Sequence, residues 1–324
     1  MRKPPSPRRS ADDRLFRLGT GFFALLVVLL VGGIAFELYD NSRLSIQKFG
    51  WHFWQTTTWD PVAGDFGALP FIWGTLYSSL LALVISTPIA LGIAIFLSEL
   101  SPRFLRTPLA FLTELLAAIP SIVYGLWGIF VLVPIVRQIE VHTPDWLKKA
   151  PLFTGPPLGV GMLAAGLILA VMVIPFTSSV AREVLKAVPA TQREAAYALG
   201  ATRWEAIQAA LRYGRTGIAG AIMLGFGRAI GETMAVTMVI GNNPRISSSL
   251  FAAQHTMAAV IANEFTEADT DLYLNALIEI GLVLFVITLV INALSRLLIW
   301  SVNREVKVEA VTKAAATALP EAAA

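Results

Sequence analysis

Residues 182–241 read REVLKAVPATQREAAYALGATRWEAIQAALRYGRTGIAGAIMLGFGRAIGETMAVTMVIG, and this stretch decides the fold. Its first half is a polar, basic segment that lies between two apolar runs of membrane-spanning length. Its second half is apolar but carries Arg228 and Glu232, which are four residues apart. A soluble protein has no reason to flank a charged helical loop with such segments. The stretch therefore indicates a membrane protein whose charged loop meets a cytosolic partner.

The composition agrees with a membrane protein. Of the 324 residues, 56% are hydrophobic and only 15% are charged, whereas soluble chains carry about 25% charged residues. The apolar residues come in long blocks, which predicts an all-α polytopic membrane protein without a soluble domain. The chain has no cysteine and only three widely separated histidines. Disulfides and thiol catalysis are therefore excluded, and we expect no metal site.

Six apolar runs alternate with polar connectors, and each run is expected to form one membrane helix. The runs cover residues 18–38, 71–97, 108–136, 158–180, 217–241 and 273–300. The first is interpreted as a membrane helix rather than a signal peptide, because its apolar core is long and no small-residue cleavage site follows. Pro120 and Pro134 are expected to break the third run, since proline removes a helical hydrogen bond.

This pattern divides the chain into three parts. Residues 1–17 form a basic N-terminal segment, and residues 18–300 form the six-helix transmembrane domain with the charged loop at 181–216. Residues 301–324 form a polar, alanine-rich tail that is expected to be disordered.

The distribution of Lys and Arg predicts the orientation of the chain. Residues 1–17, 98–107, 181–216 and those after 295 hold 18 of the 25 basic residues, whereas the connectors 40–70, 137–157 and 242–272 hold 6. Basic loops stay in the cytosol. Both termini and the charged loop are therefore expected on the cytosolic side.

The charged loop carries two sequence signatures of a helix start. Thr191 is followed three residues later by Glu194, and Thr202 by Glu205, and both pairs fit the capping box. Gly200 stands where a helix would end in a left-handed residue. The loop is thus expected to hold two short helices around a glycine hinge. On these residues alone, Glu194 and Gly200 could be a cap and a stop with no further role.

Arg228 and Glu232 would share one face of a helix because they are four residues apart. An arginine near the centre of a span costs about 2.5–3.5 kcal/mol on insertion scales, so it normally faces protein or water. Two interpretations remain open. The two residues could form a mutually neutralising ion pair that fixes helix packing. Alternatively, Arg228 could bind an anion in the transport path, with Glu232 pairing with Arg228 when the path is empty. Gly227 and Gly231 interleave with the pair and offer a close helix contact.

The segment Glu194-Ala195-Ala196, followed after three residues by Gly200, resembles the EAA loop of ABC-importer permeases. This resemblance implies the type I importer permease fold, in which the loop forms a coupling helix that docks on an ATPase subunit. The family pattern usually continues to Ile-x-Leu-Pro, but residues 210–212 here read Ala-Leu-Arg. The missing proline affects the expected angle at which the chain enters the fifth span, and it does not affect the expected docking of the loop on the ATPase.

Further motifs resemble the phosphate-specific ABC transporter permeases, in particular the PstC type. They are LSEL at 97–100, ELLAAIPSIVYG at 114–125, GRAIGETMAV at 227–236, GN at 241–242 and ANEF at 262–265. The resemblance implies that Arg228 and Glu232 take part in phosphate passage. It also implies the partners: a second, PstA-like permease, two PstB-like ATPase subunits and an extracytoplasmic phosphate-binding protein, with membrane lipid and no nucleic acid. Phosphate as substrate comes from the resemblance alone.

Glu114 lies at the cytosolic end of the third run, six residues before Pro120. It could line the path, cap a broken helix, or pair with a loop arginine such as Arg106.

The sequence has no Gly-x-x-x-x-Gly-Lys-Ser/Thr motif and no nucleophile–base constellation. We therefore expect a non-catalytic subunit without a cofactor, while ATP and Mg²⁺ bind the partner ATPase. Two alternatives stay open: a permease for sulfate or molybdate, and a secondary anion transporter or channel. A purely structural scaffold is disfavoured by Arg228.

Overall fold

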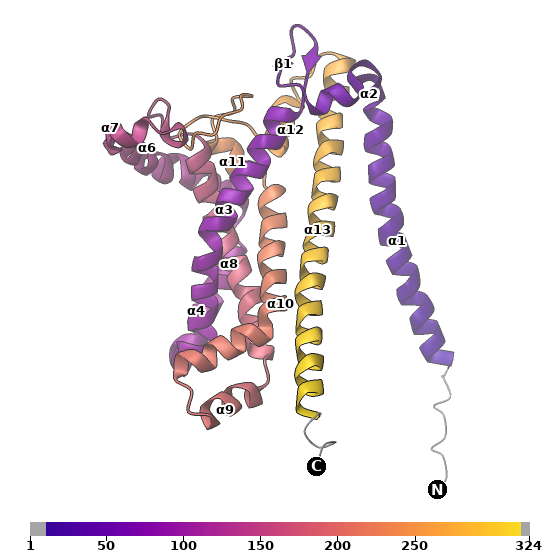
Figure 1. Cartoon of the computed structure of the whole chain (residues 1–324). Coiled ribbons are helices and arrows are strands. Elements are labelled where there is room, and N and C mark those ends of the chain that lie inside the picture. Colours follow the sequence, from indigo (N-terminus) through magenta and orange to yellow (C-terminus); the bar gives the residue numbers. More distant parts are fainter. Residues whose placement is uncertain (1–10, 319–324) are drawn as a thin grey trace.

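Long apolar helices run along the molecule in the computed structural model, which describes residues 11–318 (Figure 1). Within this part of the chain, five helical segments are long and apolar enough to cross a membrane. They are Leu15–Asn41 of α1 (Ala11–Asn41), Leu69–Leu100 of α3 (Leu69–Ile95) and η2 (Phe96–Leu100), Ser121–His142 of α5 (Ser121–Trp127), η3 (Gly128–Leu132) and α6 (Val133–His142), Met162–Ala187 (α8), and Asp271–Leu297 of α13 (Asp271–Ala318).

One more long helix runs along the bundle in addition to these five segments. It is α10 (Arg203–Ile230), which has 28 residues. The predicted span 217–241 is wrong in its boundaries, because α10 begins 14 residues earlier and ends at Ile230. A short break follows, and α11 (Met234–Val239) continues beyond it. The first turns of α10 carry charged side chains, so α10 is less apolar than the other passes.

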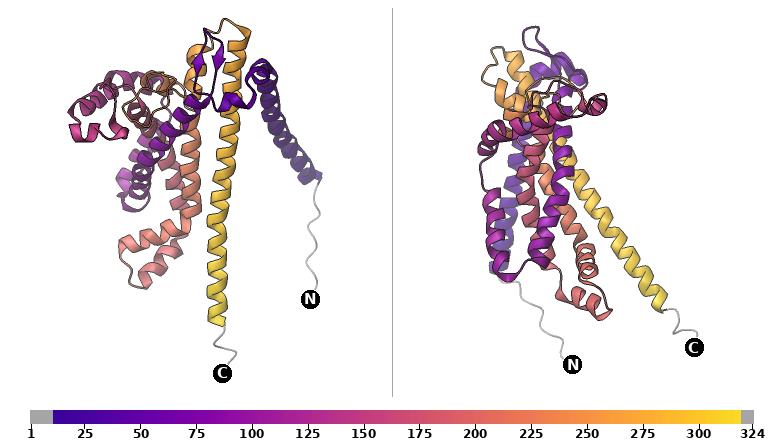
Figure 2. Two further views of the ribbon diagram at one scale, coloured as in Figure 1. Left: turned by 45° about the horizontal axis from the view of Figure 1, so that its top comes forward. Right: turned by 90° about the vertical axis from the view of Figure 1, so that its left-hand side faces the viewer.

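The two ends of the bundle differ. The start of α1, the end of α13 and the short helix α9 (Ala190–Ala198) lie at the lower end in Figure 1, and Figure 2 gives the same arrangement from two other sides. The sequence also predicts that both termini and this loop share a side. The other end carries α2 (Arg43–Phe49), η1 (Gly50–Trp54), the antiparallel strands β1 (Trp59–Asp60) and β2 (Asp65–Phe66), and α12 (Met257–Glu264).

The third apolar run breaks once rather than twice. It forms α4 (Arg103–Ala117), α5 (Ser121–Trp127), η3 (Gly128–Leu132) and α6 (Val133–His142), with the break directly before α5. Pro120 has no N–H to give the carbonyl of Leu116, and the hydroxyl of Tyr124 donates to that oxygen at 2.8 Å instead. Pro134 breaks nothing, because the helix continues from α5 through η3 into α6, and the wider π-helical turn η3 directly before it accommodates the missing N–H.

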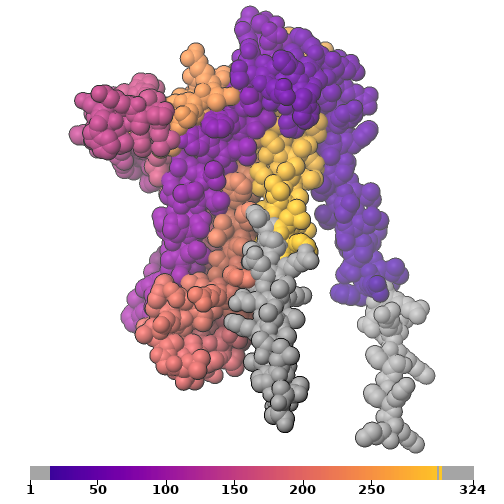
Figure 3. Space-filling model, viewed as in Figure 1, coloured from indigo at the N-terminus to yellow at the C-terminus, as the bar shows by residue number. Residues whose placement is uncertain are grey.

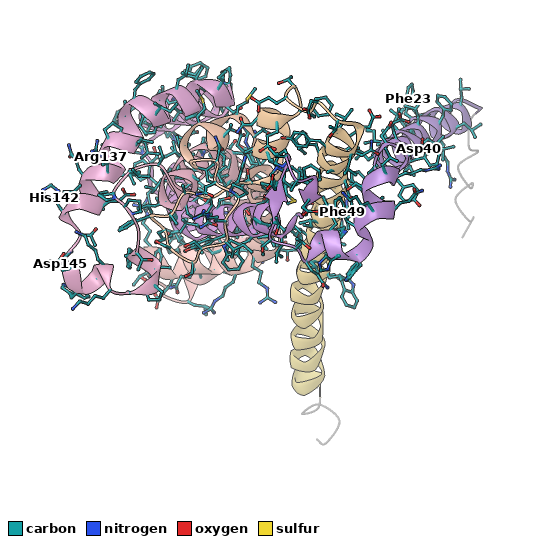
Figure 4. The ribbon with its side chains drawn as sticks, turned by 90° about the horizontal axis from the view of Figure 1, so that it is seen from above. Phe23, Asp40, Phe49, Arg137, His142 and Asp145 are labelled. Atoms are coloured by element: carbon teal, nitrogen blue, oxygen red, sulfur yellow. The ribbon has the colours of Figure 1, made fainter. Side chains whose placement is uncertain are left out.

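Seen from above, α6 lies at the edge of the molecule opposite α1 (Figure 4). Arg137, His142 and Asp145 mark that edge, and Phe23 and Asp40 mark α1. The short α7 (Asp145–Lys148) and η4 (Pro151–Phe153) follow α6 and lead back to α8.

The centre of the bundle is α8, whose apolar segment is the most buried of the five candidate spans in the described chain. Glycines bring the neighbouring helices close to it. A Cβ on Gly217 would lie 2.7 Å from Val184, and one on Gly225 would lie 2.3 Å from the hydroxyl of Thr177. Within the described part of the chain, no other helix lies close to Gly227 or Gly231: a Cβ on Gly227 would meet nothing within 4 Å, and one on Gly231 would meet only the Gly227 carbonyl oxygen, at 3.9 Å. Helix α10 therefore packs on α8 through glycines earlier in its sequence.

A second core closes the end of the bundle that carries the strands. Phe66 and Tyr273 stack with ring centroids 5.3 Å apart, and Trp59 contacts Phe66 edge-on. Glu264 accepts hydrogen bonds from Trp59 Nε1 at 2.8 Å and from the Tyr273 hydroxyl at 2.6 Å. Trp59 therefore packs against this core.

The terminal segments differ from the predicted domain boundaries. Helix α1 begins at Ala11 rather than after residue 17, and α13 continues through residues 301–318, where disorder was expected. Alanine has the highest helix propensity, which favours continuation of α13. The remaining parts of the predicted terminal segments, residues 1–10 and 319–324, lie outside the described residues.

Candidate functional site

Arg228 lies in the last turn of α10, just before the break that separates α10 from α11. Its side chain is exposed in the single chain. The guanidinium carbon lies 5.7 Å from the ring centroid of Phe176 on α8. This cation–π contact orients the guanidinium without neutralising it. Arg228 therefore presents a permanent positive charge at an interruption of the helix.

Glu232 does not share a helix face with Arg228, because α10 ends between them at Ile230. Its Oε1 atom instead lies 3.4 Å from the backbone N–H of Ala235, in the first turn of α11. Among the side chains that the structure describes (residues 15–297, 299 and 300), Arg228 has no carboxylate within 4.0 Å. Of the two interpretations, the mutual ion pair of Arg228 and Glu232 does not form between these side chains, and anion binding by Arg228 stays a prediction.

Glu114 pairs with Arg182 of α8, not with Arg106. Arg182 Nη2 lies 2.7 Å from Glu114 Oε1 and 3.0 Å from Glu183 Oε1. The Arg182 side chain is only 6% exposed, whereas that of Glu114 is 54% exposed. The pair therefore links α4, below the break at Pro120, to the central helix α8.

The charged loop is shorter than the predicted 181–216, because α8 runs to Ala187 and α10 begins at Arg203. Residues 188–202 remain, and we refer to them as the α9 loop. Gly200 has a backbone φ of +82°, a left-handed conformation that suits glycine, and it ends the α9 turn as predicted.

Only one of the two predicted capping boxes forms. Thr202 and Glu205 cap the start of α10 reciprocally, and hydrogen bonds from the Thr202 backbone N–H and hydroxyl lower the pKa of Glu205. Helix α9 begins earlier, at Ala190 after Pro189, so Thr191 lies inside the helix and cannot cap it.

The outward surface of α9 consists of the residues that the sequence singled out and their neighbours. Glu194 and Ala195 are exposed and Ala196 is half-buried, whereas Tyr197 and Leu199 expose large apolar side chains. Figure 3 shows the α9 loop as a projection at the lower end of the molecule. Exposed apolar side chains on a short helix next to small alanines are suited to docking on another protein.

The contacts that hold the α9 loop to the bundle were not predicted from the sequence. Arg193 forms hydrogen bonds to both carboxylate oxygens of Glu99, at 2.5 and 3.2 Å, and Arg203 donates to the Glu99 carbonyl at 2.7 Å. Glu99 is part of the quoted LSEL motif at 97–100. The motif marks this position, but nothing in it names the arginines.

Comparisons with known proteins agree with this architecture. Residues 86–307 match the family described as binding-protein-dependent transport system inner membrane component. The chain belongs to this family. It includes both Arg228 and the α9 loop within the matched segment.

Curated relatives extend the similarity to nearly the whole chain. It is 45% identical to the phosphate transport system permease protein PstC of Mesorhizobium japonicum, over 91% of this chain and 92% of that protein. It is 48% identical to the PstC protein of Pasteurella multocida, over 90% and 93% respectively. A probable PstC of Methanocaldococcus jannaschii is 35% identical, over 88% and 92%.

A solved structure shows the same fold at low sequence identity. A chain of the MetNI methionine ABC transporter in an inward-facing conformation is 16% identical, with a TM-score of 0.54. The similarity covers 71% of this chain and 94% of that chain. This inner membrane component therefore has the fold of an ABC importer permease, with several apolar helices that cross the membrane.

Proposed function

We propose that this chain is a transmembrane permease subunit of an ATP-driven importer that carries inorganic phosphate across the cytoplasmic membrane. The observation that carries the proposal is the guanidinium of Arg228 at the break between α10 and α11, which has no carboxylate partner among the described side chains. A guanidinium stays charged and binds phosphate oxygens in a fork geometry. The PstC names of relatives 45% and 48% identical supply phosphate as the anion.

The proposed partners follow from the family and from the two ends of the bundle. The α9 loop and both termini face the cytosol, where Tyr197, Leu199 and Glu194 dock on an ATPase subunit. The ATPase pair binds ATP and Mg²⁺, and this chain is non-catalytic. The opposite end receives phosphate from an extracytoplasmic binding protein.

A second permease subunit completes the path. In the described chain, none of the apolar segment of α1 is buried, and its lower half stands apart from the other helices (Figure 3). Lipid or another membrane subunit must cover these side chains. An exposed Arg228 likewise needs a second wall to form a closed path.

The test is uptake of radiolabelled phosphate by cells that lack their own high-affinity system and that express the full set of partners. Arg228→Gln should abolish uptake while the complex still assembles, because the neutral amide cannot offset the charge of phosphate. The matched control is Arg296→Gln, which removes an exposed arginine of α13. Near-normal uptake with Arg228→Gln would make Arg228 a packing residue. Competition by sulfate or molybdate would reassign the substrate, and uptake without any ATPase would indicate a secondary transporter.

Docking of the α9 loop is tested separately by co-purification. Glu194→Lys and Gly200→Pro should abolish association with the ATPase and leave membrane insertion intact. Glu267→Lys makes the same charge change at the opposite end of the bundle and should leave association unchanged. Normal association of both α9 variants would contradict the docking role.

A further inference from the structure

Glu99 is a residue of the bundle to which the α9 loop is hydrogen-bonded. It lies on η2, a π-helical turn at the lower end of α3, directly before the chain turns into α4. The Glu99 side chain is 13% exposed and that of Arg193 is 22% exposed. A two-bond contact between an arginine and a carboxylate, largely shielded from water, is among the stronger and more directional contacts in proteins.

Arg193 holds more than Glu99. Its Nη2 atom also donates to the Leu185 carbonyl at 2.9 Å, and its Nη1 donates to the Val188 carbonyl at 3.0 Å. These carbonyls are at the end of α8, where a helix leaves its last acceptors unpaired. One side chain of α9 therefore ties the end of α8 to the corner between α3 and α4. The bond from Arg203 to the Glu99 carbonyl adds the start of α10 to the same corner.

The covalent chain joins α9 only to α8 and α10, so a displacement of α9 reaches α3 and α4 only through non-covalent contacts. From the corner, α4 runs from Arg103 to Ala117 and ends at the break before Pro120. Near that end, the Glu114–Arg182 contact fastens α4 to α8 again. Helix α4 therefore begins at the α3–α4 corner and ends at the break before α5.

We infer that Glu99 is a positioning residue that transmits the displacement of the α9 loop to α3 and α4 and stays bound to Arg193 throughout the transport cycle. This inference rests on the proposed function, because it assumes that an ATPase moves α9. It assigns a role to the LSEL motif that phosphate passage leaves unexplained. Without the contact, α9 would be linked to the α3–α4 corner only indirectly, through the Arg203 hydrogen bond and the packing of α3 and α4 on α8, and less of its displacement would reach the corner.

The experiment compares phosphate transported with ATP hydrolysed by the complete complex in liposomes. Glu99→Gln keeps the size of the side chain but removes its charge. Arg193→Lys keeps the charge but removes the planar guanidinium that bonds to both carboxylate oxygens. Both should lower the ratio of phosphate to ATP by about tenfold, the equivalent of one charge-assisted contact. The ATPase rate should remain within about twofold of the native rate, since docking through Glu194 and Leu199 is unchanged. Asp40→Asn, which breaks an exposed ion pair with Arg43 at the other end, is the control.

A covalent tether then separates loss of the contact from a general defect. The chain has no cysteine of its own, so Glu99→Cys/Arg193→Cys can be linked by a short bifunctional thiol reagent. Linking should restore the ratio of phosphate to ATP that the unlinked double variant has lost. A linked protein that remains uncoupled, or single variants with a native ratio, would overturn the inference. Failure of the native complex to transport phosphate would refute the proposed function instead.

Discussion

Glu114 offers a sharp test of how charge is balanced at the lower end of the bundle. Its partner Arg182 is almost fully buried and has two carboxylates within 3.0 Å, Glu114 and Glu183. Glu114→Gln removes one negative charge and keeps a hydrogen-bond acceptor of the same shape. The guanidinium is then left with Glu183, which it shares with Lys186 at 3.0 Å.

The expected loss lies between two limits. Removal of one partner from a fully buried ion pair costs about 3–5 kcal/mol, because it leaves a charge without compensation. A pair of exposed side chains contributes only about 0–1 kcal/mol. Arg182 is 6% exposed and Glu114 is 54% exposed, so water screens one side of the contact. With Glu183 still in place, we expect Glu114→Gln to lower the free energy of unfolding by about 1–2 kcal/mol.

The free energy of unfolding can be measured by titrating SDS into mixed micelles that contain the purified chain. Asp40→Asn serves as the reference, because both members of its pair with Arg43 are about half exposed, and it should change the value by less than about 0.5 kcal/mol. A Glu114→Gln loss equal to that of Asp40→Asn would show that the contact adds no stability. A loss above about 4 kcal/mol would show that Glu183 does not compensate Arg182.

Two further predictions concern the outer connector that packs on α3. A Cβ on Gly74 would lie 2.0 Å from the carbonyl oxygen of His255, so Gly74→Ala should destabilise the chain by about 3 kcal/mol or more in the same titration. The control is Gly92→Ala, which should not destabilise the chain because a Cβ on Gly92 would meet nothing within 4 Å. Equal effects of the two substitutions would contradict this packing. Burial lowers the pKa of His255 to about 4, below its unfolded value of about 6.5. The unfolded chain therefore binds more protons between these values, and stability should fall by up to roughly 3 kcal/mol as the pH drops from 6.5 towards 4. His255→Gln should flatten the dependence of stability on pH, whereas His142→Gln, which replaces an exposed histidine, should leave it unchanged. An unchanged slope in His255→Gln would show that another group causes the pH dependence.

Several features could be predicted from the sequence because their signals are local. The break before α5 follows from the missing N–H of Pro120, and the cap of α10 follows from Thr202 and Glu205 three residues apart. The position of the α9 loop between two long apolar runs follows from hydropathy. The local signal failed at Thr191, because α9 begins directly after Pro189, two residues earlier than the capping pattern suggests.

The charge pairs could not be predicted in the same way. Spacing suggested that Arg228 and Glu232 share a face, but α10 ends between them. Its C-cap is Gly231, which the sequence pattern was interpreted to offer as a helix-packing glycine rather than as a helix end. The partners that do form are distant in sequence: Arg193 and Glu99 are 94 residues apart, and Arg182 and Glu114 are 68 apart.

The sequence by itself determined the class of protein, the polar and apolar segments and the family motifs. This is possible because the transfer of a residue into a membrane depends on that residue and its near neighbours, and a helix satisfies its own backbone groups. Only the tertiary structure decided that Arg228 and Glu232 do not pair and that Glu99 accepts hydrogen bonds from Arg193. Charged side chains find partners across helix interfaces, and glycines such as Gly217 and Gly225 fix how closely those helices approach. The pairing of charges is therefore a property of the packed bundle and not of any one segment.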